Sequence, residues 1–301
     1  MVAGRIEDPA ARRRLSSLAG LWLDEAPLDT LGRSAAELAR APGVAGIACA
    51  PPRSERDAAR EDAARALADA LGARPLSVGP RREADAPGFL LRVGRPNVFL
   101  RLPVRGDAPA AARRLAAAGT ALHLAGLNAP GRFDAALEGW ISGLEARAAA
   151  GGELAPAILG VDVGRLERAF DSIAYQRMDS APTDSIRAAY RVLIGRVGWA
   201  VAAVCRRRLA LTLNSRRFAA LALKGAPRPL LLVSAPAARL AEFASPETLL
   251  AVPYAAATDL PPVPAGRALE DAYDDAKRML DKPANYQIDL DVIAGELEEA
   301  P

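Results

Sequence analysis

The chain has 301 residues, of which 51% are hydrophobic and only 5% aromatic, so it is long enough for two average domains or one large α/β barrel with an aliphatic core. Its 39 basic and 36 acidic residues give a formal net charge of +3. A balance this even argues against nucleic acid or an anionic membrane as a partner. The two cysteines, Cys49 and Cys205, form no CxxC pair and no disulfide framework, which favours a reducing, cytoplasmic setting.

Targeting and membrane segments are not expected. The N-terminal segment MVAGRIEDPAARRR has no apolar stretch of signal-peptide length. The longest apolar run, near residues 197–204, is interrupted by Gly198, is followed by three arginines and is too short to span a bilayer. We therefore expect a cytoplasmic protein without a membrane segment.

Short apolar segments alternate with alanine-rich helical stretches along the chain, a pattern typical of parallel βα units. The predicted strands, in chain order, are 21–24, 44–50, 98–103, 121–127, 157–163, 229–233 and a short one around Val252. The predicted helices are 54–72, 109–118, 131–151, 184–205, 215–224 and 266–282. Because no segment has the composition of a linker, the sequence predicts one α/β barrel domain over residues 1–301, with 266–301 as its helical extension.

Three charged residues stand at or just past predicted strand ends: Asp24, Arg101 and Arg165. In an α/β barrel the chemistry gathers at the C-terminal ends of the strands, so we expect these residues at one end of the barrel. A guanidinium in such a mouth needs a carboxylate or another anion beside it. Arg101 is predicted to pair with Asp24 and fill the mouth; the alternative is an anion site shared by Arg101 and Arg165. Arg165 has Asp162 and Asp171 as further possible partners.

Several segments resemble the transaldolase family, and they occur in the family's order. They are LWLD at 21–24, RPNVFLRLP at 95–103, RFDAALEGWISGLEARAAAGG at 132–152, RFAALALKGAPRPLL at 217–231, PETL at 246–249 and IDLD at 288–291. The segment 132–152 is the most specific of them. The resemblance implies a (β/α)8 TIM-like barrel and a relation to the pentose phosphate pathway, where the family transfers three-carbon ketol units.

The departures from the family fall on its chemical groups. The lysine that forms a Schiff base with the sugar is replaced by Arg101. An amine can attack a ketone and lose water to form an imine, whereas a guanidinium keeps its delocalised charge and cannot. The family's substrate-binding asparagine falls on Ala50, the threonine of its fifth strand on Ala125, the serine of its sixth near Gly160 and the phosphate-binding residue of its seventh near Ala237.

Other positions match the family. The resemblance implies that Asp24 is a retained general acid/base and that Arg165 is a phosphate-binding arginine. Arg165 and Asp171 together resemble the family's arginine-and-aspartate segment after the sixth strand, which implies a role in substrate binding.

The remaining reactive residues offer no substitute for the lost nucleophile. The chain's lysines are Lys224, Lys277 and Lys282, all predicted on helices rather than at strand ends. His123 is the single histidine and is predicted to be a packed or hydrogen-bonded core residue, although a Cys49–His123 nucleophile pair is a minor alternative. With no second histidine or neighbouring cysteine, no metal site is expected. No nucleotide-binding motif is present, so no cofactor is expected.

The barrel is expected to be irregular or incomplete around its third strand. The span between Pro51 and Arg101 is clearly shorter than in the family, and residues 88–93 are the candidate third strand. Only residues 94–97 would then join it to the next strand, whereas parallel neighbours need a dozen or more. An antiparallel hairpin is therefore predicted. The sequence, which stops at Pro301, is also expected to end short of the helix that closes the family's active site.

These observations favour a transaldolase-like pseudoenzyme, catalytically inactive, that acts as a scaffold or regulatory subunit with a protein partner or another copy of itself. The alternative is a phosphosugar-binding enzyme of the pentose phosphate type (a transaldolase, lyase or isomerase), which would use Asp24 with Arg101 and Arg165 as an anion clamp. An active transaldolase with a shifted alignment and a sugar-phosphate sensor are further alternatives.

Overall fold

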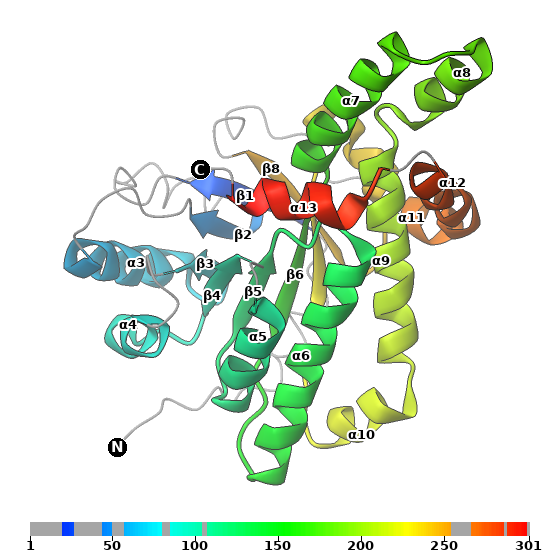
Figure 1. Cartoon of the computed structure of the whole chain (residues 1–301). Coiled ribbons are helices and arrows are strands. Elements are labelled where there is room, and N and C mark those ends of the chain that lie inside the picture. Colours follow the sequence, from blue (N-terminus) through cyan, green and yellow to red (C-terminus); the bar gives the residue numbers. More distant parts are fainter. Residues whose placement is uncertain are drawn as a thin grey trace.

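A computed structural model describes residues 20–26, 44–49, 57–79, 85–103, 107–253, 266–285 and 288–299. Eight parallel strands close into a barrel in the order of the chain, with helices packed around it (Figure 1). The strands are β1 (Leu21–Ala26), β2 (Val44–Cys49), β3 (Leu76–Val78), β4 (Val98–Pro103), β5 (Leu122–Ala125), β6 (Ala157–Asp162), β7 (Leu230–Ser234) and β8 (Thr248–Pro253). The predicted (β/α)8 barrel is confirmed.

Helices lie around the outside of the barrel. They are α3 (Asp57–Leu71), α4 (Ala86–Val93), α5 (Ala108–Ala117), α6 (Pro130–Ala149), α7 (Val163–Asp179), α8 (Asp184–Leu193), α9 (Val197–Leu213), α10 (Arg216–Leu223), the 3₁₀ helix η3 (Ala237–Phe243), α11 (Ala268–Asp271), α12 (Tyr273–Asn285) and α13 (Leu290–Glu299).

The prediction for the third strand is wrong. Residues 88–93 lie in helix α4, and β3 is Leu76–Val78, paired in parallel with both β2 and β4. Within α4 the buried apolar residues Phe89 and Val93 are four positions apart while Leu91 is exposed, which is the period of a helix and not of a strand. Gly94 ends the helix with a left-handed φ of 61°. The connection from β3 to β4 is thus an ordinary helical crossover, and the barrel is complete.

One further helix prediction needs correction, and one helix was not predicted. The predicted helix 184–205 is broken into α8 and α9, because Gly195 between them has a φ of 69° that a continuing helix does not allow. Helix α7 was not predicted from its polar sequence. It begins directly after β6, where the carboxylate of Asp162 accepts a hydrogen bond from the backbone N–H of Arg165 and so caps the helix.

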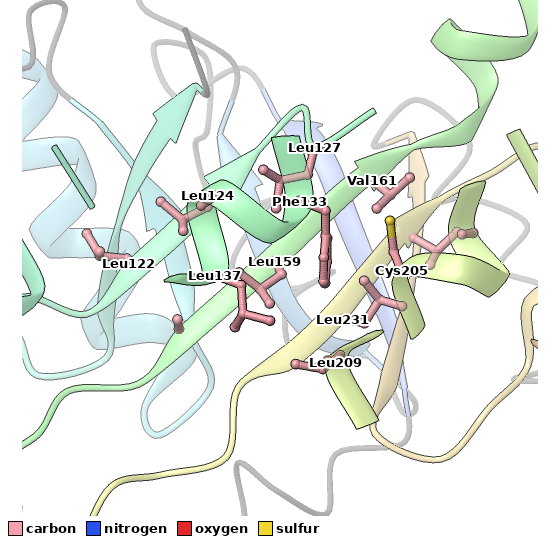
Figure 2. Packing of buried hydrophobic residues seen from close by; sticks show 14 of the residues in the cluster. Leu122, Leu124, Leu127, Phe133, Leu137, Leu159, Val161, Cys205, Leu209 and Leu231 are labelled. Carbon is pink, nitrogen blue, oxygen red and sulfur yellow. The ribbon is translucent and has the colours of Figure 1, made fainter. Parts of the chain in front are cut away.

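The strands bury both faces, as parallel barrel strands must. Outward-facing residues of β5, β6 and β7, such as Leu122, Leu159 and Leu231, pack against residues of α6 and α9 that include Phe133 and Leu209 (Figure 2). A second, smaller apolar cluster fills the inside of the barrel: Trp22, Ala45, Ala48, Phe99, Ile158, Leu230, Leu232, Leu249 and Ala251. The barrel is therefore a packed core, and its polar residues gather toward the C-terminal ends of the strands.

Among the described helices none is by itself long and apolar enough to cross a membrane. One pair bent by 55°, Asp184–Leu193 with Val197–Leu213, meets that test by length and composition only.

Candidate functional site at the barrel mouth

An ion pair spans the C-terminal end of the barrel. Nη1 of Arg101 on β4 donates to Oδ1 of Asp24 on β1 over 2.9 Å and to the backbone carbonyl of Cys49 on β2 over 3.0 Å. Strands β1 and β4 are not neighbours in the barrel, so the side chains meet across its opening. Both are mostly buried, with 17% of the Arg101 side chain and 14% of the Asp24 side chain exposed. The ion pair predicted from the sequence is present.

A second polar layer lies next to this ion pair, inside the barrel. His123 on β5 is the register partner of Arg101 on β4, and its Nδ1 lies 2.6 Å from the hydroxyl of Ser77 on β3. The ring is fully buried and meets Trp22 edge to face, with ring centroids 6.1 Å apart. Burial first, and then the positive charge of Arg101, lower the pKa of His123 well below its ordinary value. His123 is therefore the hydrogen-bonded core residue that the sequence predicted.

His123 explains why position 160 carries no side chain. A Cβ atom added to Gly160 on β6 would lie 2.9 Å from Nε2 of His123, closer than side-chain atoms normally approach. A side chain at this position, such as the serine that the resemblance would place near it, would therefore clash with the imidazole. The absence of a side chain at position 160 and the buried imidazole of His123 therefore belong to one packing arrangement.

Arg165 lies in the first turn of α7, just past the end of β6, as predicted, but its partner was not foreseen. Its Nη2 donates to the backbone carbonyl of Leu297 in α13 over 2.8 Å. The neighbouring Asp162 ends β6, and its backbone N–H donates to the side-chain oxygen of Asn128 over 2.8 Å. Burial raises the pKa of Asp162, and the negative charge of Asp24 also raises it.

Asp171 lies elsewhere. It stands two turns further along α7, and its carboxylate accepts the backbone N–H of Gly195 between α8 and α9. Glu167, one turn earlier, accepts the backbone N–H of Trp199 in the first turn of α9. Burial raises the pKa of both carboxyls. These two acidic residues thus hold α7 against the start of α9, and the geometry of Asp171 is that of a helix-junction contact.

Near Ala237, where the transaldolase resemblance would place a phosphate-binding residue, the structure shows an arginine bound within the chain. Ala237 begins η3, and the nearest arginine is Arg239, two residues on. Its Nη1 donates to Glu167 over 2.6 Å, and its Nη2 and Nε donate to Glu242 over 2.8 and 3.0 Å. This guanidinium is bound by two carboxylates of the same chain.

The structure brings Asp24 and Arg101 together and leaves Asp171 outside their cluster. Ala50 lies outside the described residues, and Ala125 ends β5. All three lysines are exposed: Lys224 at the end of α10, and Lys277 and Lys282 on α12.

The contact of Ser77 with His123 could not be predicted from the sequence, since the strand of Ser77 has only three residues. Asp162 and Asn128 carried one usable signal, because Asn128 directly follows the predicted strand 121–127 and Asp162 lies near the end of the predicted strand 157–163.

Metal ligation has no support in the part of the chain that the structure describes, where no group of three or more His, Cys, Asp or Glu residues could hold an ion. Both cysteines are buried and free of disulfide bonds, with Cys49 ending β2 and Cys205 within α9.

No protein-family model matches the chain, and no curated protein matches it either.

Proposed function

We propose that this protein is a transaldolase-like pseudoenzyme that acts as a scaffold or regulatory subunit in the cytoplasm. The observation that carries the proposal is the ion pair of Arg101 with Asp24. The side chain at the position of the Schiff-base lysine is a guanidinium, and its hydrogen bonds go to a carboxylate and a carbonyl of the same chain. A guanidinium keeps its delocalised charge, so Arg101 has no nitrogen electron pair with which to attack the carbonyl of a sugar.

The rest of the mouth supports this proposal. Asp24 would serve as a general acid/base only if it could approach a reacting atom, and here it is held by Arg101. Position 160 has no room for a serine beside His123, and position 125 is an alanine at the end of β5. The lysines are exposed on helices α10 and α12, away from the strand ends at the barrel mouth. These changes reinforce one another, because each removes a different group from the same reaction.

The anion-clamp alternative needs Arg101 and Arg165 to face one ligand. In the structure Arg101 is directed at Asp24 and Cys49, and Arg165 at the carbonyl of Leu297. A phosphosugar would therefore have to displace internal partners from both guanidinium groups. This arrangement favours the pseudoenzyme over the clamp.

Transaldolase turnover of the wild-type protein tests the proposal, with fructose 6-phosphate and erythrose 4-phosphate as substrates. We expect a rate equal to the background without enzyme. The matched variants are Arg101→Lys, which restores an amine, and Arg101→Gln, which does not. Turnover clearly above background by the wild-type protein, abolished in Asp24→Asn, would contradict the proposal and return the enzyme alternative.

A further inference from the structure

The second half of α7 and the whole of α8, residues 171–193, form an arm that projects from the barrel (Figure 1). Among the elements that the structure describes, α8 packs chiefly against α7. Tyr190 and Leu193 are the buried residues of α8, and the side chain of Thr183 caps its first turn. The arm is therefore a folded helical hairpin in which one face of α8 is packed and the opposite face is left to solvent.

The outward face of α8 is centred on Ala188. The residues three and four positions away on either side share a face with it, and all four are exposed: Asp184, Ser185, Arg191 and Val192. The side chain of Asp184 is 96% exposed, and Val192 is 51% exposed. This face therefore combines an apolar side chain, two small ones and one charge of each sign.

The two charges lie where a second copy of the same helix would complement them. Asp184 and Arg191 are seven residues apart, which is about 10 Å along a helix. If a second α8 is turned about a two-fold axis at Ala188, the two helices run antiparallel and Asp184 of each copy faces Arg191 of the other. The same rotation places Ser185 opposite Val192. The outward face of α8 is therefore complementary to itself.

Both charged groups can take part in such a contact. Arg191 makes no ion pair with any residue that the structure describes. Asp184 pairs with Arg187 of its own helix over 2.7 Å, but an ionised carboxylate has about four acceptor sites and can bind a second guanidinium. The small side chain of Ala188 at the crossing point lets two helix axes approach to the usual distance of about 8–10 Å.

We propose that the arm is the contact of a homodimer, in which α8 of one copy packs antiparallel on α8 of a second copy about a two-fold axis at Ala188. Such a contact is isologous, since the same patch serves both copies. Two ten-residue helices bury less than the roughly 1,200–2,000 Å² of a standard interface, so the dimer should be weak and concentration-dependent. The second copy supplies a partner for the scaffold role and in that respect rests on the proposed function, whereas the arm contains none of the residues of the mouth.

Sedimentation velocity of the full-length protein, over a series of concentrations, tests the proposal. The average mass of the wild-type protein should rise from that of one chain toward that of two. Arg191→Glu places like charges opposite each other at both ends of the contact, so it should weaken dimerisation by at least about tenfold. Arg191→Lys keeps the charge and is the matched control, which should dimerise like the wild type.

A disulfide at the axis gives a second measurement. The thiols of Ala188→Cys meet at the two-fold axis, where the two Cβ atoms can approach to the roughly 4 Å that a disulfide needs. Mild oxidation should therefore link two copies, against a low background because Cys49 and Cys205 are buried. Ala222→Cys, at an exposed alanine of α10, is the control and should remain unlinked.

A wild-type chain that stays monomeric at every concentration would overturn the second copy as the partner of the arm. A dimer that Arg191→Glu leaves intact, or that crosslinks at position 222 as readily as at 188, would also overturn the proposal, because it would use another surface. Neither experiment measures turnover, so a failure here leaves the inactive mouth of the proposed function to its own assay.

Discussion

The barrel mouth and the outer surface of α6 contain ion pairs of the same chemistry in opposite surroundings. In the mouth, Arg101 and Asp24 are both mostly buried. On the surface, Arg217 donates to Glu138 and Glu145, each over 2.6 Å, and its side chain is 41% exposed. Hydrogen bonds from Arg217 lower the pKa of both glutamates. The surface arginine has more hydrogen bonds to carboxylates, yet solvent screening leaves such surface pairs weak. Removing one partner of a buried pair costs more, because the other charge stays in a poorly solvated place.

The comparison teaches that surroundings, rather than the number of bonds, decide what an ion pair does for the protein. The surface pairs can be lost with little consequence. The pair in the mouth links β1 and β4, two strands that are not neighbours in the barrel.

The largest effect is expected from breaking the mouth pair on one side only. Arg101→Met should lower the free energy of unfolding by about 3 kcal/mol, because the mostly buried carboxylate of Asp24 loses its ion pair with Arg101. Urea denaturation measures the change. The double variant Arg101→Met, Asp24→Leu should recover most of the loss. If the single and double variants are equally unstable, the pair is not what holds the mouth.

A smaller loss is expected from crowding the inside of the barrel. A Cβ at Gly46 would lie 2.4 Å from the ring of Trp22 and 2.8 Å from the carbonyl of Pro75. Gly46→Ala should therefore destabilise the fold by about 2 kcal/mol, in the range measured for overpacked cores. Gly72→Ala is a useful comparison, since no atom lies within 4 Å of its added Cβ and only its φ of 63° opposes the change. Equal stability of Gly46→Ala and wild type would contradict the packing described for β2.

Acidification should weaken the fold through His123. The unfolded chain takes up a proton near its ordinary pKa of 6.5, whereas the buried imidazole resists protonation. As the pH falls below 6.5 the unfolded state therefore gains the proton first, and stability drops by up to about 1.4 kcal/mol per pH unit. Stability is fully present above pH 6.5.

Urea denaturation at pH 6.5 and 5.5 measures this slope in the wild type and in His123→Gln. Because His123 is the single histidine, its removal should flatten the profile over this range. The buried carboxyls of Asp162 and Glu167, whose pKa values are raised, contribute with the opposite sign and cancel in the difference. Identical slopes in the two proteins would show that His123 is readily protonated in the folded state.

The smallest effect is expected on the surface. Arg217→Ala removes the contacts with Glu138 and Glu145 and should cost less than about 1 kcal/mol, because these groups are screened by solvent. The loss should shrink further in 0.5 M salt. A cost comparable with that of Arg101→Met, measured under the same conditions, would remove the distinction between the two regions.

The sequence predicted the parts of this structure that depend on local pattern. The alternation of apolar and alanine-rich segments indicated the barrel, and strand ends placed Arg101 and Asp24 at its mouth. It failed at β3, where three residues between Pro75 and Gly79 are too few to show a period. It also assigned residues 88–93 to a strand, although the four-residue spacing of Phe89 and Val93 is helical.

Long-range contacts were beyond the reach of the pattern. The hydrogen bond from Arg165 to Leu297 joins residues 132 positions apart, and no periodicity in either segment points to the other. The Ser77–His123 contact joins strands on either side of β4. Only the closed barrel brings these groups together.

The most direct test of an inactive mouth is covalent trapping. The wild-type protein is incubated with fructose 6-phosphate and sodium borohydride, and its intact mass is measured. Any imine on Lys224, Lys277, Lys282 or another amine would be reduced to a stable adduct. We predict no sugar adduct beyond that of denatured protein, and a specific adduct at position 101 in Arg101→Lys. A specific adduct on folded wild-type protein would contradict the proposal that the protein forms no Schiff base with a sugar.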